Sequence, residues 1–229
     1  MFTQDGFGVR LEWGTDGLAT IAPHCMVVIV VDVLSFSTSV DLVVGRGSKV
    51  KLTTWTGESP GLRRPSALKS VQAGTDVNLG SPNGGALCEQ ASKLTQVMAG
   101  CLRNADAVAD RAIDVADHGP IGVIAAGEQW GVNLDERGDP GRLRPAIEDY
   151  LGAGAIVSAL LEQGYSPASP EAALSATTFR AASPYLGDLL GASGSGLELG
   201  AKGLSEDIAI AGQVNVSKAA PLLVDGMFQ

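Results

Sequence analysis

The clearest hydrophobic pattern in the chain is a run of five Val and Ile residues at positions 27–31. An unbroken β-branched run of this length predicts a strand buried on both faces, as in the centre of a parallel sheet. Residues 9–13 alternate between apolar and polar positions, which predicts a half-exposed strand at an edge of the sheet. Shorter apolar segments predict further strands at residues 49–54, 76–79, 95–98 and 121–127.

Helical patterns separate most of these strands. A long helix is predicted from Arg142, because apolar residues recur after it with a 3.6-residue period: Leu143, Ile147, Leu151, Val157 and Leu161. Other helices are expected at residues 38–45, 66–71, 102–116, 169–190, 197–199 and 205–212, the last one capped by Ser205, Glu206 and Asp207. Glycine and proline predict a turn at residues 14–17 and loops at 57–65 and 129–141.

The order of these elements predicts the fold class. Strand, helix and strand within residues 27–54 form one expected βαβ unit. We therefore expect an α/β fold of three layers, with a mostly parallel central sheet and helices on both faces. A chain of 229 residues fits a single α/β domain over residues 1–229, and a division into two lobes near 129–141 is the alternative.

Composition narrows the classes of function. The formal charge of −9 and the absence of any basic cluster longer than Arg63-Arg64 argue against a nucleic-acid surface. The longest apolar run is too short to span a bilayer and no leader pattern precedes it, so a cytoplasmic protein without membrane partners is expected. Cys25, Cys88 and Cys101 show no metal-binding spacing, which indicates free reduced thiols.

The first candidate for chemistry is Asp32, which directly follows the buried strand and precedes a cluster of hydroxyls at Ser35, Ser37, Thr38 and Ser39. Ligands of open α/β sheets bind beyond the carboxyl ends of the strands, and a helix N-terminus there favours a phosphate or another anion. The structural alternative is that Asp32 and Ser37 simply cap the following helix.

The second candidate is the turn of residues 80–86, where Ser81, Asn83 and Gly84 follow a predicted strand. Small residues let the backbone approach a ligand closely, and successive N–H groups in such a turn can form an anion-binding nest. The alternative interpretation is an ordinary Asn-Gly turn that leads into a helix.

Three further carboxylates lie near predicted strand and helix ends. Glu128 comes just past the carboxyl end of the strand at 121–127, and Glu148 and Asp149 lie in the early part of the long helix. Adjacent carboxylates near a strand end that carries an Asp are how oxygen ligands for Mg²⁺ are assembled. They can equally serve only to complement the helix dipole.

Several of these segments, in this order, resemble the 2-phosphosulfolactate phosphatase family of Mg²⁺-dependent phosphohydrolases. The resemblance rests on residues 30–38, 81–84, 100–105, 126–128, 145–149 and 152–155, and continues more weakly through 193–194, Leu197 and 206–207 to Pro221. It implies the same fold and the hydrolysis of a phosphate ester of a 2-hydroxy acid. One position departs from the family pattern, since Ser35 stands where an Arg is usual, and Ser cannot replace the bidentate contact of Arg to phosphate or sulfonate.

Together these observations predict Mg²⁺-dependent hydrolysis of a small anionic phosphomonoester. Phosphoryl transfer needs charge neutralisation, and a metal would supply what this acidic chain lacks. The predicted metal ligands are Asp32, Glu148 and Asp149, with Glu128 as ligand or general base and Asp32 as ligand or nucleophile. The residues expected to hold or orient the substrate are Ser35, Ser37, Thr38, Ser81, Asn83, Gly84 and Asn104. A homodimer is one assembly that the sequence leaves open.

Two other classes of function stay open. One is a non-catalytic protein of the same fold that binds an anion or metabolite, which Ser35 favours. The other is an acyl- or phosphoryl-transfer enzyme with Cys88 or Cys101 as nucleophile. His24 and His118, the two histidines of the chain, are poorly placed for catalysis, which argues against histidine-phosphatase chemistry and a His-based zinc site.

Overall fold

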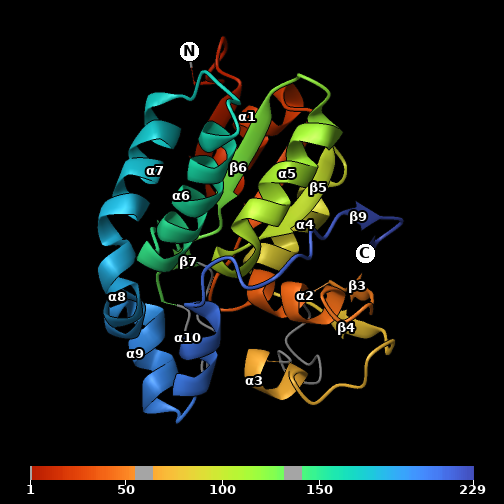
Figure 1. The fold of residues 1–229 in the computed structure, drawn as a ribbon, viewed down its shortest axis with the longest axis vertical. Coiled ribbons are helices and arrows are strands. Elements are labelled where there is room, and N and C mark those ends of the chain that lie inside the picture. Colours follow the sequence, from red (N-terminus) through yellow and green to blue (C-terminus); the bar gives the residue numbers. More distant parts are fainter. Residues whose placement is uncertain (1, 55–63, 132–140) are drawn as a thin grey trace.

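The computed structural model describes residues 2–54, 64–131 and 141–229. Its central sheet has the strand order β1-β6-β2-β5 and is parallel throughout (Figure 1). The four strands are β1 (Val9–Trp13), β6 (Ile121–Ala125), β2 (Val27–Val31) and β5 (Gln96–Gly100). As predicted, β2 is buried along its whole length and β1 is an edge strand. The predicted half-exposure of β1 is wrong, because Val9, Arg10 and Leu11 are all buried.

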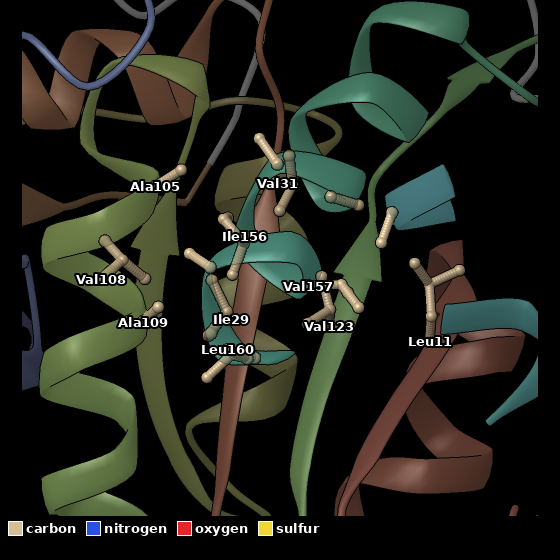
Figure 2. Packing of buried hydrophobic residues seen from close by; sticks show 14 of the residues in the cluster. Leu11, Ile29, Val31, Ala105, Val108, Ala109, Val123, Ile156, Val157 and Leu160 are labelled. Carbon is tan, nitrogen blue, oxygen red and sulfur yellow. The ribbon is translucent and has the colours of Figure 1, made fainter. Parts of the chain in front are cut away.

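The side chains of β2 alternate between two hydrophobic cores. Val27, Ile29 and Val31 belong to one core, in which they meet residues of α5 (Ala105–Ala116), α6 (Ile147–Glu162) and α7 (Pro170–Ala182). Figure 2 shows this packing, with Ile29 and Val31 facing Ile156. Val28 and Val30 belong to the second core, which includes residues of α1 (Gly14–Ile21), α2 (Phe36–Val44) and α4 (Gly84–Ala91). Helices therefore cover both faces, and the predicted three-layer α/β fold is confirmed.

A second sheet lies beside the first and has the order β4-β3-β10-β9. Its strands are β4 (Val77–Leu79), β3 (Val50–Leu52), β10 (Met227–Phe228) and β9 (Leu223–Val224). The predicted βαβ unit over residues 27–54 is wrong, because β3 pairs with β4 and β10 while β2 pairs with β5 and β6. The partner β10 comes from the end of the chain, so local pattern could not indicate it.

The predicted turn at residues 14–17 is also wrong, since α1 begins at Gly14. The glycines there serve close packing. A Cβ on Gly17 would lie 2.7 Å from the Cβ of Glu12, so the helix can turn back onto β1 only with glycine at this position. Leu18 and Ile21 are buried on the same helix and contribute to the second core.

The long helix α6 begins at Ile147, five residues later than predicted. Leu143 and Arg144 form the short strand β8 (Leu143–Arg144), which pairs with β7 (Glu128–Gln129) in an antiparallel hairpin. Pro145 favours extended backbone at the preceding residue, so the helical pattern is interrupted there.

The last third of the chain is mainly helical, as predicted. It contains α8 (Leu186–Ala192), α9 (Gly194–Ala201) and α10 (Ser205–Ala211), and α10 packs against the short α3 (Pro65–Leu68). Short 3₁₀ helices span Ala22–His24, Leu102–Asn104 and Ser183–Tyr185. The predicted cap of α10 is wrong, because the side chain of Asp207 instead accepts a hydrogen bond from the backbone of Ser66 at 2.7 Å.

Two of the predicted loops, at 57–65 and 129–141, lie mostly outside the described residues. Arg63 also lies outside them. Within the described ranges, no helix is both long and apolar enough to cross a membrane.

Candidate active site

The site is built where the carboxyl ends of β2 and β6 meet the first turns of α2, α4 and α6. Asp32 directly follows β2 and is 6% exposed. Its Oδ1 accepts a hydrogen bond from the backbone N of Phe36, the first residue of α2, at 3.1 Å. The N-cap residue of that helix is Ser35 and no side chain among the described residues caps it, so the structural alternative of a cap by Asp32 and Ser37 is wrong. Oδ2 of Asp32 accepts from the backbone N of Gly84 at 2.9 Å and from the hydroxyl of Ser81 at 3.2 Å. Asp32 therefore joins the turns before α2 and α4.

The turn of residues 81–84 connects Asp32 to Glu128. While Ser81 and Gly84 bind Asp32, the side-chain amide of Asn83 donates to Oε2 of Glu128 at 2.8 Å. The other carboxylate oxygen of Glu128 accepts from the hydroxyl of Ser195, in the first turn of α9, at 3.4 Å. The structure thus brings together three candidates that were separate in the sequence: Asp32, the turn with Ser81, Asn83 and Gly84, and Glu128.

Asp149 holds the ends of two strands in register. Its Oδ1 accepts from the backbone N of Val33 and its Oδ2 from the backbone N of Gly127, both at 2.8 Å. Val33 and Gly127 follow the carboxyl ends of β2 and β6. The side chain of Asp149 therefore connects the ends of both strands to the N-terminus of α6. The contact explains why an acidic residue is buried in the first turn of that helix.

The carboxylates of this cluster, Asp32, Glu128, Glu148 and Asp149, affect one another electrostatically. Burial raises the pKa of Asp32, hydrogen bonds from Gly84, Phe36 and Ser81 oppose the rise, and the charge of Glu148 adds to it. Burial, followed by the charges of Asp32 and Glu148, raises the pKa of Asp149 well above its usual value.

The pKa of Glu128 is raised by the same causes, although this residue is less buried. Burial and the charge of Asp32 raise its pKa to about 7, against the lowering effects of Asn83 and Arg144. Glu148 itself is 2% exposed. A group of buried carboxylates that disfavour one another's charge is a place where a cation would be stabilised.

The hydroxyls after Asp32 differ in what they bind. Ser37 donates to the carbonyl of Val30 at 3.1 Å, and Thr38 donates to the carbonyl of Val33 at 2.8 Å. Both hydroxyl protons are therefore used within the fold, and a role of these two residues in substrate binding stays a prediction. The Oγ of Ser35 is buried and makes no hydrogen bond in the described part of the chain. Ser35 is the hydroxyl of this cluster that a ligand could engage.

Asn104 lies in a different environment. It is fully buried, its Oδ1 accepts from the backbone N of Cys101 at 2.9 Å, and its Nδ2 donates to the carbonyl of Ala219 at 3.1 Å. These contacts tie the turn after β5 to the C-terminal segment. Among the described residues it makes no hydrogen bond to the carboxylate cluster, so its role in orienting substrate stays a prediction.

The chemistry of the cluster fits Mg²⁺, although its geometry is not that of a closed cage. Among the described residues, no group of three His, Cys, Asp or Glu side chains is arranged to hold a metal ion as it stands. Mg²⁺ prefers hard oxygen ligands and is often held by one or two carboxylates together with water and the phosphate of the substrate. A metal site of this open kind needs only one or two carboxylates of the cluster as ligands.

Ser195 was missed by sequence reasoning, because the sequence places it only in a glycine-rich stretch before a helix. Arg144 could be named from the sequence only as one of four arginines, with Arg63, Arg64 and Arg142, able to supply a cation in place of the family Arg. The guanidinium of Arg144 lies 5.8 Å above the ring of Trp130, and a Cβ on Gly194 would be 3.2 Å from its Nη1. No local motif in the sequence indicated that Ser195 and Arg144 lie near Glu128. The one available signal was the glycines at the start of α9, which let this helix approach closely.

The cysteines show the properties of core residues. All three are free and buried. Burial raises the pKa of Cys25 to about 11 and that of Cys101 to about 12, and burial together with the charge of Asp32 raises the pKa of Cys88 well above its usual value. A thiol is nucleophilic as the thiolate, so these pKa shifts disfavour a cysteine nucleophile.

Comparison with known proteins places the chain in one family. A sequence model of the family described as 2-phosphosulpholactate phosphatase matches residues 56–226. The chain is also 32% identical over 155 residues to a probable 2-phosphosulfolactate phosphatase from Deinococcus radiodurans, an alignment that covers 67% of this chain and 58% of that relative.

The chain therefore belongs to the 2-phosphosulfolactate phosphatase family, as the resemblance indicated. The matched range contains Ser81, Asn83, Glu128, Glu148 and Asp149, while Asp32 and Ser35 precede it.

Proposed function

We propose that the protein hydrolyses a small phosphomonoester of a 2-hydroxy acid, with 2-phosphosulfolactate as the first candidate substrate, in a Mg²⁺-dependent reaction. The observation that carries the proposal is the buried carboxylate cluster at the ends of β2 and β6, linked by the turn 81–84. Membership of the family supports the substrate class.

In this proposal Asp32 and Glu148 hold the metal. Asp149 was predicted as a third ligand, and we give it the role of fixing the strand ends, because its two oxygens bind the amides that follow β2 and β6. Both oxygens of Asp32 also accept backbone hydrogen bonds, so Asp32 would bind the metal through its remaining lone pairs. Bound Mg²⁺ would neutralise the charge of the carboxylates and of the transferring phosphoryl oxygens. The alternative role for Asp32 is that of a nucleophile, because an aspartate can also attack a phosphoryl group.

Glu128 is the proposed general base. Its pKa of about 7 suits a group that takes a proton from an attacking water near neutral pH. The hydrogen bonds from Asn83 and Ser195 hold its two oxygens in place, so the carboxylate would be oriented before the substrate arrives. Loss of either donor should therefore affect the rate more than the affinity for the substrate.

The anionic groups of the substrate would meet hydrogen-bond donors rather than the Arg that is usual in the family. Ser35 offers a buried hydroxyl without a partner among the described residues, at the N-cap of α2. A hydroxyl contributes one donor and no charge, so we expect weaker binding of a sulfonate than an Arg would give. The preference among 2-hydroxy-acid phosphates is thus expected to depend on position 35.

A non-catalytic anion-binding protein is the second candidate, and the missing Arg at position 35 favours it. The two functions are separated by measuring phosphate release from 2-phosphosulfolactate, 2-phospholactate and a chromogenic phosphomonoester, with Mg²⁺ and with a chelator. We expect release that requires Mg²⁺. A folded protein that binds these anions without releasing phosphate under any condition would support the second candidate instead.

A further inference from the structure

A polar pocket lies outside the carboxylate cluster, where the C-terminal part of α2 meets α10 and the segment that follows α10. Figure 1 shows these elements in the lower half of the molecule, with the C-terminal segment leading from α10 toward β9. The pocket has a volume of about 390 Å³, and its polar lining includes Asp41, Arg46, Lys69, Arg103, Ser217 and Lys218. None of its lining residues belongs to the carboxylate cluster.

The pocket is basic, although the protein as a whole carries a formal charge of −9. Lys69 is paired with Glu206 at 2.7 Å, and Arg103 is paired with Asp41 at 2.8 Å. Arg46 and Lys218 form no ion pair with any described residue. Two positive charges of the lining are therefore left without a matching carboxylate in that part of the chain.

The two arginines are held in fixed positions. Arg103 is 9% exposed; its Nε donates to Asp41, and its Nη1 donates to the carbonyl of Ile210 and to the side-chain oxygen of Gln213. Its Nη2 makes no hydrogen bond in the described ranges. Nη1 of Arg46 donates to the carbonyls of residues 68, 69 and 71 at the end of α3. Both guanidinium groups are thus ordered while some of their donors stay available.

We propose that this pocket binds a small tetrahedral oxyanion of the phosphate or sulfate class, contacted by Arg46, Arg103 and Lys218. Preordered guanidinium donors bind such anions with little loss of conformational entropy, and a lysine at the rim adds a mobile positive charge. This is a site for an anion separate from the hydrolysis proposed at Asp32, and it does not require Mg²⁺.

The test uses the intact, metal-free protein in chelator, because without a cation the carboxylate cluster repels anions. Inorganic phosphate and, separately, sulfate are titrated calorimetrically at low ionic strength. The variant is Lys218→Glu, since Lys218 is exposed and forms no ion pair with described residues. Lys51→Glu, at an exposed lysine of β3, is the matched control because it changes the net charge equally.

We expect saturable binding of at least one anion in the wild-type protein and in Lys51→Glu, and affinity lower by about tenfold or more in Lys218→Glu. Equal weakening in both variants, unchanged affinity in Lys218→Glu, or no saturable binding by the folded wild-type protein would overturn the proposal. These outcomes are independent of phosphatase activity, because no metal or ester is present in the titration.

Discussion

The carboxylate of Asp32 accepts a 2.9 Å hydrogen bond from the backbone N of Gly84, and no larger residue fits at position 84. A Cβ there would lie 2.7 Å from both the Cβ and Oδ2 of Asp32 and 2.9 Å from the ring of Phe36. The contact between these two residues fixes the distance between the turns that begin α2 and α4. The turn of residues 81–84 thus contains small residues because its backbone approaches Asp32 closely, and not because the turn has to be flexible.

Gly84→Ala should displace Asp32 and lower activity strongly. The overlap must be relieved by movement of backbone or of the carboxylate, at a cost of about 1–3 kcal/mol in the free energy of unfolding. We expect kcat on 2-phosphosulfolactate to fall by about 10²-fold, because small displacements at a catalytic site have effects of this size. Gly187→Ala in α8, where a Cβ would meet nothing within 4 Å, is the control and should leave kcat unchanged. Equal activity of the two variants would contradict the proposed geometry.

The pKa of Glu128 predicts how the stability of the metal-free protein depends on pH. A carboxyl whose pKa is raised from 4.5 to about 7 binds its proton more tightly in the folded state. Its contribution to stability is present below its ordinary pKa and is lost as the pH rises through about 7, a loss of about 3 kcal/mol at most. The free energy of unfolding in chelator should therefore fall between pH ~5 and ~8, and added Mg²⁺ should restore it at the upper end.

Glu128→Gln removes this titration, so urea unfolding of the variant should show a shallower fall with pH than the wild-type protein. Glu171→Gln, at an exposed position in the first turn of α7, is the matched control and should keep the wild-type slope. An identical slope in all three proteins would show that Glu128 does not titrate in this range.

Asp149 and Glu148 are adjacent, yet their substitution should have different effects. Asp149→Asn leaves at least one of the amides of Val33 and Gly127 without an acceptor, which should lower the free energy of unfolding by about 1–3 kcal/mol. Glu148→Gln removes a buried charge that raises the pKa of Asp32 and Asp149, so the metal-free protein should be as stable or more stable. Denaturant unfolding of both variants tests this. A loss in Glu148→Gln as large as that in Asp149→Asn would contradict these separate roles.

The buried thiols predict a negative result for cysteine chemistry. With the pKa values of Cys25 and Cys101 near 11 and 12, the folded protein should react slowly with a thiol-specific disulfide reagent at pH 8, and all three thiols should react after unfolding. Prolonged treatment with iodoacetamide should leave phosphatase activity in place. Rapid modification of one thiol together with loss of activity would favour the cysteine nucleophile.

The fold could be predicted where its signal is local. The β-branched run of β2, which ends at Asp32, identified the centre of the sheet. Asp32 and Glu128 were both predicted to lie just beyond strand ends, and the structure brings these two strand ends together. The partners of β3 could not be predicted in this way, because β10 contributes a strand of two residues from the far end of the chain. Likewise, Ser195 reaches Glu128 through tertiary packing alone. The function of Asp149 as a bridge between Val33 and Gly127 also depends on contacts distant in sequence.

Substitution of Asp32 by Asn is the decisive test of whether the cluster around this residue hydrolyses a phosphate ester. Phosphate release from 2-phosphosulfolactate in Mg²⁺ is measured for this variant and for Asp188→Asn, an exposed aspartate in α8, after circular dichroism has shown both to be folded. We expect wild-type kcat in Asp188→Asn and a decrease of at least about 10²-fold in Asp32→Asn. Undiminished, Mg²⁺-dependent release by folded Asp32→Asn would overturn the proposed role of Asp32.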